Sequence, residues 1–357
     1  MPLNNPAVAL AVALTLAFVP SSRLCAAAAE DTSDQEVLDR LLVRRPADHA
    51  IEAGLVWLRS QTKPDGKLGE QWPTALTSLA VMAHLAAGIV PRDAEHSAWL
   101  RRAIAAVIAD QLPSGYFGEK DGSRMYGHGI TTLMLAEALG MDGDPTREER
   151  MRASVERAVA VTVNAARVKK APGHAGGWRY LPTDASSDLS LSGWQLLSLH
   201  AAHRIGITVP EQVISDACAY ARGLTSEDGR VGYESRGQDN AALRGLGMLC
   251  FSIAGNEANP LVDRIAERIA QDPIAFSGKW FFYRAYYDAV GLSRARPDAW
   301  TAYRPRFESE LTRHQDKEGF WPSPPGGNEG GYGRVYCTSM GVLALAVERH
   351  LLPAYQR

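Results

Sequence analysis

Four titratable side chains, His128, Asp188, Asp239 and Lys279, each stand at or just before an apolar stretch of the sequence. The unperturbed pKa of a histidine lies near neutrality, so His128 could serve as an acid, a base or a ligand. The two carboxyl groups could transfer protons in the same way. We therefore predict His128, Asp188 and Asp239 as catalytic candidates. Two such carboxylates about 5 to 10 Å apart across an open cleft would favour glycoside hydrolysis.

The same positions also have a structural interpretation. Backbone N–H groups at a helix start need an acceptor, and aspartate often supplies it, so Asp188 and Asp239 could cap the helices that follow. His128 stands between two glycines, a setting typical of a packed turn. If these helices all point the same way, however, their starts converge on one cavity, and the four titratable groups would face a common space.

Aromatic residues accompany these positions. Trp280, Tyr283 and Tyr287 are spaced i, i+3 and i+7, so they share a helical face that could line an apolar or carbohydrate-binding cavity or pack in the core. Other aromatics stand near glycine turns and could join neighbouring units by packing: Trp57, Phe117, Trp178, Tyr233 and Trp321. The full set that we expect at the cavity is Tyr126, Trp178, Tyr180, Tyr233, Trp280, Tyr283, Tyr287 and Tyr336.

The sequence carries no local signature of a metal or cofactor site. After residue 29 the cysteines are Cys218, Cys250 and Cys337, none of them in CxxC spacing, and HExxH does not occur. Scattered cysteines do not make a disulfide framework, so each is expected to be a small apolar core residue. The formal net charge is -2, and no basic stripe interleaves with aromatics. We therefore expect no metal, no cofactor and no nucleic-acid partner.

These residues belong to a unit that recurs about every 50 residues, a glycine turn followed by an apolar helix pattern. The turns carry Gly66, Gly115, Gly176, Gly229 and Gly319, and the long last interval leaves room for one unmarked unit with a helix at about 279–290. Such a period indicates helical hairpins that bury their apolar faces by stacking on one another. The prediction is an all-α fold of six hairpins.

The two helices of each unit differ in their patterns. Those expected at 75–87, 130–139 and 340–347 are apolar nearly all round, which is typical of helices enclosed on every side. Those at 94–110 and 260–270 alternate charged and apolar residues, as an outer, half-solvated layer would. No linker or charge run divides the chain after the leader, so we expect a single domain.

The first 29 residues form a separate segment. Residues 7–19 are apolar and are followed by small residues up to Ala29, a pattern typical of a signal peptide and too short for a good membrane span. We predict a signal peptide at 1–29, a mature domain at 30–357, and export to the periplasm or the extracellular space. No Lys or Arg precedes the apolar run, so an uncleaved interfacial anchor is the alternative. Lipidation of Cys25 is disfavoured by Leu24 before it.

Two of the turns carry a fuller motif. Gln61, Asp65 and Gly66 lead into an apolar run at 74–79, and Gln315, Asp316, Gly319 and Trp321 lead into one at 338–345. These turns resemble the repeats of squalene cyclases and protein prenyltransferase β-subunits, and the resemblance covers roughly residues 45–357. The segments at 126–129, 176–180, 281–283 and 352–357 resemble, in particular, small exported bacterial members. This implies a single-domain (α/α)6 toroid, with six inner helices around a central cavity and six outer helices.

The catalytic motifs of these families are largely missing. The position of the cyclase DxDD motif falls on 188–191, where Asp188 remains but Ser190 and Leu191 replace the later acids, and a serine cannot protonate an alkene. The zinc ligands of prenyltransferases are also absent: Cys337 lies near where the ligating His would fall, but no DxC precedes it. A DDxxD motif for diphosphate-bound magnesium and the thioester-forming GCGEQ motif do not occur.

Three functions remain open at this stage. The first is a binding protein that holds an apolar or polyprenyl-like ligand, or a peptide, in its cavity. The second is an enzyme, either a terpene cyclase or mutase with a displaced acid such as Asp188, or a glycan-acting hydrolase. The third is a cell-envelope scaffold whose cavity is filled by its own side chains. The expected partners are accordingly an apolar small molecule or a peptide, and a membrane surface or another envelope component.

Overall fold

The computed structural model describes residues 44–349, 351 and 352. The described residues contain twelve α-helices, α2 to α13, and three short 3-10 segments, η1 (Ala241–Leu243), η2 (Asn328–Tyr332) and η3 (Val347–Arg349). The predicted signal peptide, Cys25 and residues 30–43 of the expected mature domain lie outside the described residues. None of the described helices is both long enough and apolar enough to cross a membrane.

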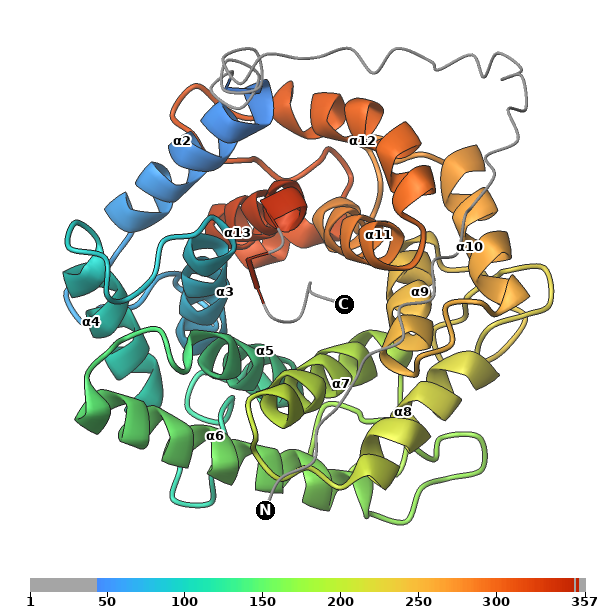
Figure 1. The fold of residues 1–357 in the computed structure, drawn as a ribbon, viewed down its shortest axis with the longest axis horizontal. Coiled ribbons are helices and arrows are strands. Elements are labelled where there is room, and N and C mark those ends of the chain that lie inside the picture. Colours follow the sequence, from blue (N-terminus) through green and yellow to red (C-terminus); the bar gives the residue numbers. More distant parts are fainter. Residues whose placement is uncertain (1–43, 350, 353–357) are drawn as a thin grey trace, which may run out of the picture. The chain divides into compact units, whose positions relative to one another are not determined.

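The helices form two concentric rings (Figure 1). The inner ring consists of α3 (Pro73–Ala86), α5 (Arg124–Ala138), α7 (Leu189–Arg204), α9 (Arg244–Ile253), α11 (Phe281–Ala295) and α13 (Gly333–Ala346). The outer ring consists of α2 (Pro46–Ser60), α4 (Ser97–Ile108), α6 (Pro145–Ala166), α8 (Glu211–Gly223), α10 (Pro260–Gln271) and α12 (Pro297–Thr312). Each inner helix packs on the next, and α13 packs on α3 to close the ring. The predicted all-α (α/α)6 toroid is confirmed.

The two rings follow the two helix patterns of the sequence. Every residue of α3 after Pro73 is buried, polar residues included, because the helix is enclosed by neighbours on all sides. The outer helix α10 instead buries a single stripe, Val262, Ile265, Ala266 and Ile269, at the i, i+3, i+4 and i+7 positions of one face. Cys218, Cys250 and Cys337 are buried and unpaired, as expected for small core residues.

The turn glycines fit each hairpin onto the next one. Gly176 has a φ of +86°, which L side chains rarely adopt, and a Cβ atom there would overlap the backbone oxygen of Asp216 in α8. Gly319 meets the backbone of Ala53 in α2 in the same way and so helps to close the ring. Corresponding approaches are made by Gly115 to Arg157 and by Gly229 to Arg264. The glycine period therefore reflects a repeated backbone contact between one turn and the following outer helix.

Candidate functional site

A cavity of about 620 Å³ lies at the N-terminal ends of the inner helices. Residues in or just before each of the six inner helices contribute to its wall, which is the convergence that the toroid prediction implied. Aromatic side chains dominate the wall: Trp72, Tyr126, Tyr180, Trp194, Tyr233, Trp280, Tyr283, Tyr332 and Tyr336. The remainder is mostly aliphatic, and the polar lining residues are Ser123, Arg124, Ser190 and Asn240. A volume of this size suits a drug-sized or larger apolar ligand.

One aromatic cluster joins three separate segments beside the cavity. The Tyr332 ring lies 5.3 Å from that of Trp72, 6.1 Å from that of Trp280 and 5.1 Å from that of Tyr336, between centroids. Trp72 precedes α3, Trp280 precedes α11, and Tyr332 belongs to η2 before α13. Ring contacts at these distances add to the stabilisation from buried area, so the cluster holds this part of the wall together.

Most of the aromatics expected at the cavity are in its wall. Tyr126, Tyr180, Tyr233, Trp280, Tyr283 and Tyr336 line it. Trp178 does not: it is buried between the rings, and its indole N–H donates to the backbone oxygen of Thr162 at 3.0 Å. Tyr287 is also fully buried and packs against Tyr283, Tyr286 and Trp194 instead.

Trp72, Trp194 and Tyr332 were not among the expected cavity residues. Trp72 precedes Pro73, the first residue of α3, and a Pro at a helix start is a recognisable signal for the N-terminal end where the cavity lies. Trp194 lies in α7 only four residues after Ser190, so helical spacing from Ser190 could have found it. Tyr332 stands in a glycine-rich segment without periodicity, and no sequence signal pointed to it.

Asp188 lies directly behind the cavity wall. It is fully buried and caps α7, because its Oδ1 accepts a hydrogen bond from the backbone N–H of Leu191 at 2.8 Å. The same oxygen accepts from the Ser190 hydroxyl at 2.7 Å, and Oδ2 lies 3.4 Å from the Arg179 guanidinium. Burial raises the pKa of Asp188, and these partners oppose that effect.

The Asp188 carboxyl is connected to the cavity through one side chain. Ser190 lines the cavity, and its hydroxyl also hydrogen-bonds the hydroxyl of Tyr126, another wall residue. The Ser190 hydroxyl has one proton, which it donates to Asp188. The Tyr126 hydroxyl must therefore donate its own proton to the Ser190 oxygen. The free lone pairs of the Tyr126 oxygen are then available to a ligand.

His128 has a structural role inside the inner ring. It is fully buried, does not line the cavity, and its Nδ1 accepts a hydrogen bond from the backbone N–H of Phe117 at 3.1 Å. Its Nε2 lies 3.1 Å from the backbone oxygen of Ala158, to which it donates. In three other repeats a side-chain hydroxyl oxygen accepts the corresponding backbone N–H after the turn: Thr77 accepts from Leu68, Ser192 from Trp178 and Thr338 from Trp321. Burial lowers the pKa of His128 to about 4, so the ring is neutral at neutral pH.

Replacing His128 by asparagine should therefore affect stability and leave ligand binding unchanged. The amide oxygen can replace Nδ1 as acceptor for Phe117, but the donor to Ala158 is lost. We expect a loss of about 1–3 kcal/mol in the free energy of unfolding, measured by urea denaturation. A folded His128→Asn protein that had lost its ligand or its activity would contradict the structural assignment.

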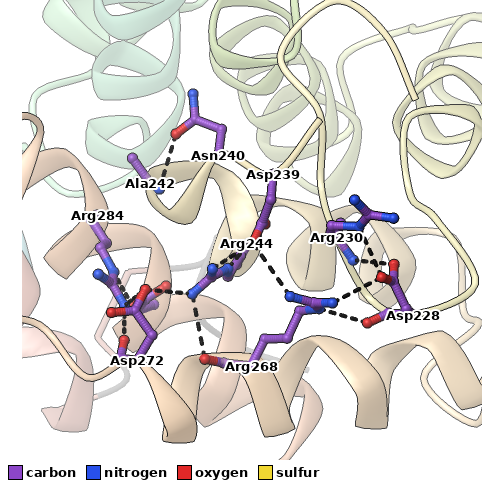
Figure 2. A network of polar contacts seen from close by, with 10 residues as sticks. Asp228, Arg230, Asp239, Asn240, Ala242, Arg244, Arg268, Asp272 and Arg284 are labelled. Carbon is purple, nitrogen blue, oxygen red and sulfur yellow. Dashed lines mark hydrogen bonds and ion pairs between the residues drawn. The ribbon is translucent and has the colours of Figure 1, made fainter. Parts of the chain in front are cut away.

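Asp239 is not among the residues that line the cavity and lies in a network of ion pairs (Figure 2). Its Oδ2 is 2.6 Å from Arg244 and 3.5 Å from Arg268. Arg244 is itself nearly buried and also pairs with Asp272 at 2.8 Å, and Arg268 pairs with Asp228 at 2.9 Å. The network joins the segment before α9 to α10 and to the chain that leads into α11, so Asp239 serves to connect repeats.

Lys279 is exposed and lines a second, smaller cavity of about 250 Å³, together with Trp280 and Arg284. Of the four titratable groups singled out in the sequence, none lines the main cavity, and Asp188 alone reaches it through a neighbour. The structure does not bring His128, Asp188, Asp239 and Lys279 to a common space.

Glu329 is a buried carboxyl group beside the cavity that the sequence pattern did not reveal. Its oxygens accept hydrogen bonds from the backbone N–H groups of Phe282 at 3.1 Å and Tyr283 at 2.9 Å, so it caps α11 from another segment. The hydroxyl of Tyr336, a wall residue, lies 3.4 Å away. Burial raises the pKa of Glu329 from 4.5 to about 7.

This pKa predicts a pH-dependent contribution to stability. The pKa in the folded protein lies above the unfolded value, so between about pH 4.5 and 7 the folded state binds the additional proton. The contribution is present below pH 4.5 and is lost as the pH rises through 7, to a total of about 3 kcal/mol. Urea denaturation across this range should show the wild type losing stability relative to Glu329→Gln, which does not titrate. Parallel pH profiles for the two proteins would contradict this assignment.

In the part of the chain that the structure describes, no group of His, Cys, Asp and Glu side chains is arranged to hold a metal ion. The polar groups of the described cavity wall include tyrosine and serine hydroxyls, the Asn240 amide and the guanidinium of Arg124.

Comparison with known proteins identifies the fold. No protein-family model and no curated protein matches the sequence. Among solved structures, a variant of the type II terpene cyclase MstE from Scytonema, in complex with geranylgeranyl dihydroxybenzoate, matches with a TM-score of 0.54 and 15% identity, over 86% of this chain and 98% of that chain. The alpha-1,6-mannanase from Salegentibacter matches with a TM-score of 0.61 and 9% identity, over 86% of this chain and 100% of that chain. Identities this low establish the fold and not the activity. The chain thus has an (α/α)6 toroid fold, which it shares with a terpene cyclase and a glycan-acting enzyme.

Proposed function

We propose that this protein binds an elongated apolar molecule, such as an isoprenoid or another lipid chain, in its central cavity. The observation that carries the proposal is the cavity itself, about 620 Å³ with a wall made mainly of aromatic and aliphatic side chains. Burial of an apolar ligand against such a wall contributes roughly 25 cal/mol per Å². A similarly built toroid, the Scytonema cyclase, was solved with a geranylgeranyl compound.

The chemistry of the wall favours binding over hydrolysis. No Asp, Glu, His or Cys side chain is among the described residues that line the cavity. Glycoside hydrolysis needs two carboxyl groups flanking the substrate, whereas Asp239 is engaged by Arg244 and Arg268 outside the wall. A scaffold role, in which the protein's own side chains would fill the cavity, is disfavoured because the side chains of the described residues leave it open.

The proposal places this activity in the cell envelope. The leader pattern at 1–29 supports export to the periplasm or the extracellular space, where the ligand would come from a membrane or another envelope component. The intact mass of the chain purified from its native host tests this point. We expect removal of about the first 29 residues. A full-length mass would indicate a retained anchor.

Mass spectrometry of the purified mature chain tests the binding proposal. We expect the wild type to carry an extractable apolar molecule in a stoichiometric amount. Trp280→Ala, which removes an aromatic wall residue, should carry much less, while its circular dichroism spectrum stays unchanged. A wild type that neither carries such a molecule nor takes one up from added lipid would contradict the proposal.

A second function, cyclisation of a polyene, rests on the link from Asp188 through Ser190 to Tyr126 in the wall. For this step Asp188 must be protonated and the hydrogen bonds reversed, so that the carboxyl donates to Ser190, Ser190 to Tyr126, and Tyr126 to a ligand double bond. Loss of another proton from the resulting cation would yield an isomer of unchanged mass and return the proton to the carboxylate. We expect an isomeric product by gas chromatography–mass spectrometry if this chemistry occurs, and at least 100-fold less with Asp188→Asn. Unchanged polyene after incubation with the wild type would exclude this function and leave binding.

A further inference from the structure

We infer that the ligand of the central cavity is an amphiphile with an anionic head group, a carboxylate or a phosphate, and that Arg124 binds this head group. The inference rests on the binding function proposed above and specifies the class of ligand for the same site. Arg124 is the one charged residue among the described residues that line the cavity, and it is also exposed to solvent, which places it at the mouth.

The backbone of Arg124 is held in an unusual conformation. Its φ is +56°, and among the described residues the other non-glycine residue with a positive φ is Trp72, which also lines the cavity. The Arg124 N–H donates to the Gly118 oxygen at 2.8 Å. The two residues lie so close together that a Cβ atom on Gly118 would overlap the backbone of Arg124. Strain of this kind persists where the surroundings impose it and is concentrated at binding sites.

The guanidinium of Arg124 is free of partners among the described residues. Within the described residues it makes no hydrogen bond and no ion pair, although Asp121 stands only three residues earlier. The Oδ1 of Asp121 accepts from the backbone N–H of Ser123 at 2.9 Å and from its hydroxyl at 2.6 Å, and Oδ2 accepts from the N–H groups of Thr74 at 3.1 Å and Ala75 at 3.2 Å. Both oxygens of this acid are therefore engaged, Oδ1 by Ser123 and Oδ2 by the first turn of α3, and neither forms an ion pair with Arg124.

Arg179, an arginine beside the cavity wall, is already neutralised. Arg179 lies beside Tyr180 and Tyr233, but it pairs with Glu234 and with Asp188. Among the described residues that line the main cavity, Arg124 is therefore the cation available to a ligand. A guanidinium offers two parallel N–H donors to a carboxylate or phosphate, and such charge-assisted pairs are about twice as strong as neutral hydrogen bonds. A ligand with an apolar tail would bury that tail against the aromatic wall of the cavity, and its anionic head group would pair with Arg124.

Matched ligand pairs test this inference. Retinoic acid and retinol share an isoprenoid chain and differ in the head group, and both quench tryptophan fluorescence. We expect the wild type to bind retinoic acid at least tenfold more tightly than retinol. In Arg124→Gln the two affinities should become equal through a weaker affinity for the acid, with retinol binding unchanged. Arg124→Lys should retain part of the preference, because it keeps the charge but loses the planar fork.

Two further arms complete the test. Arg236→Gln, which removes an exposed arginine that pairs with Glu227, should keep the full preference of the wild type. Displacement of retinol by dodecyl phosphate, compared with dodecanol, shows whether a phosphate serves as well as a carboxylate. Equal binding of acid and alcohol by the wild type in both pairs would overturn the head-group inference and leave the proposed function standing. No saturable binding of any of these compounds would overturn both.

Discussion

Replacement of Gly176 by alanine is expected to lower the free energy of unfolding by about 3 kcal/mol or more. The new side chain carries two costs. At a φ of +86° an L residue loses about 1–2 kcal/mol, and the Cβ atom overlaps the backbone of Asp216 in α8, so the turn or the helix must move. A loss of this size corresponds to a decrease of roughly 5 to 10 °C in the melting temperature, measured by calorimetry.

Gly173 provides the matched control. It stands in the same loop with a φ of +83°, but a Cβ atom there would meet no atom within 4 Å. Gly173→Ala therefore carries the conformational cost alone, about 1–2 kcal/mol. Equal losses for the two variants would contradict the idea that turn glycines allow close packing of one hairpin on the next outer helix.

Replacement of Ala75 by phenylalanine is expected to weaken retinol binding about 30-fold, or about 2 kcal/mol. Ala75 lies in the first turn of α3 and lines the cavity, so a phenyl ring there extends into space that the ligand would fill. The ligand must then shift or leave part of its apolar surface in water, which costs free energy in proportion to the area exposed. The affinities are measured by tryptophan quenching.

Ala105 on the exposed face of α4 is the control position for the same change. Ala105→Phe adds the same ring to an outer helix and should leave the affinity unchanged. If Ala75→Phe remained folded and bound retinol as tightly as Ala105→Phe, the ligand would have to bind outside the cavity.

The sequence predicted the ring architecture because the same physical requirement recurs in the repeats. Gly176 and Gly319 mark turns where a side chain would collide with the next outer helix, and that requirement produces the period. The unmarked unit could still be placed by its spacing, and its predicted helix at 279–290 corresponds to α11 (Phe281–Ala295). Helix ends were less accurate, because capping groups such as Asp121 and Glu329 come from other segments.

The site was harder to predict, because its members come from contacts between repeats. His128 is of a residue type common in catalysis, yet its ring hydrogen-bonds the backbone of Phe117 and Ala158 and so has a structural role. In other repeats a hydroxyl group takes the place of the ring in accepting the backbone N–H after the turn. Glu329 and Tyr332 lie in a glycine-rich segment without periodicity, so their places beside the cavity follow from tertiary packing alone. Asp188 was predicted both as a candidate acid and as a helix cap, and the structure shows the cap.

Isothermal titration of retinol into the wild type at several temperatures tests the central claim most directly. The account predicts one saturable site per chain and a negative heat-capacity change, because binding removes apolar surface from water. It also predicts a clearly weaker affinity in Ala75→Phe. A folded wild type without saturable binding, or binding that Ala75→Phe leaves untouched, would contradict the claim that the aromatic cavity is a ligand site.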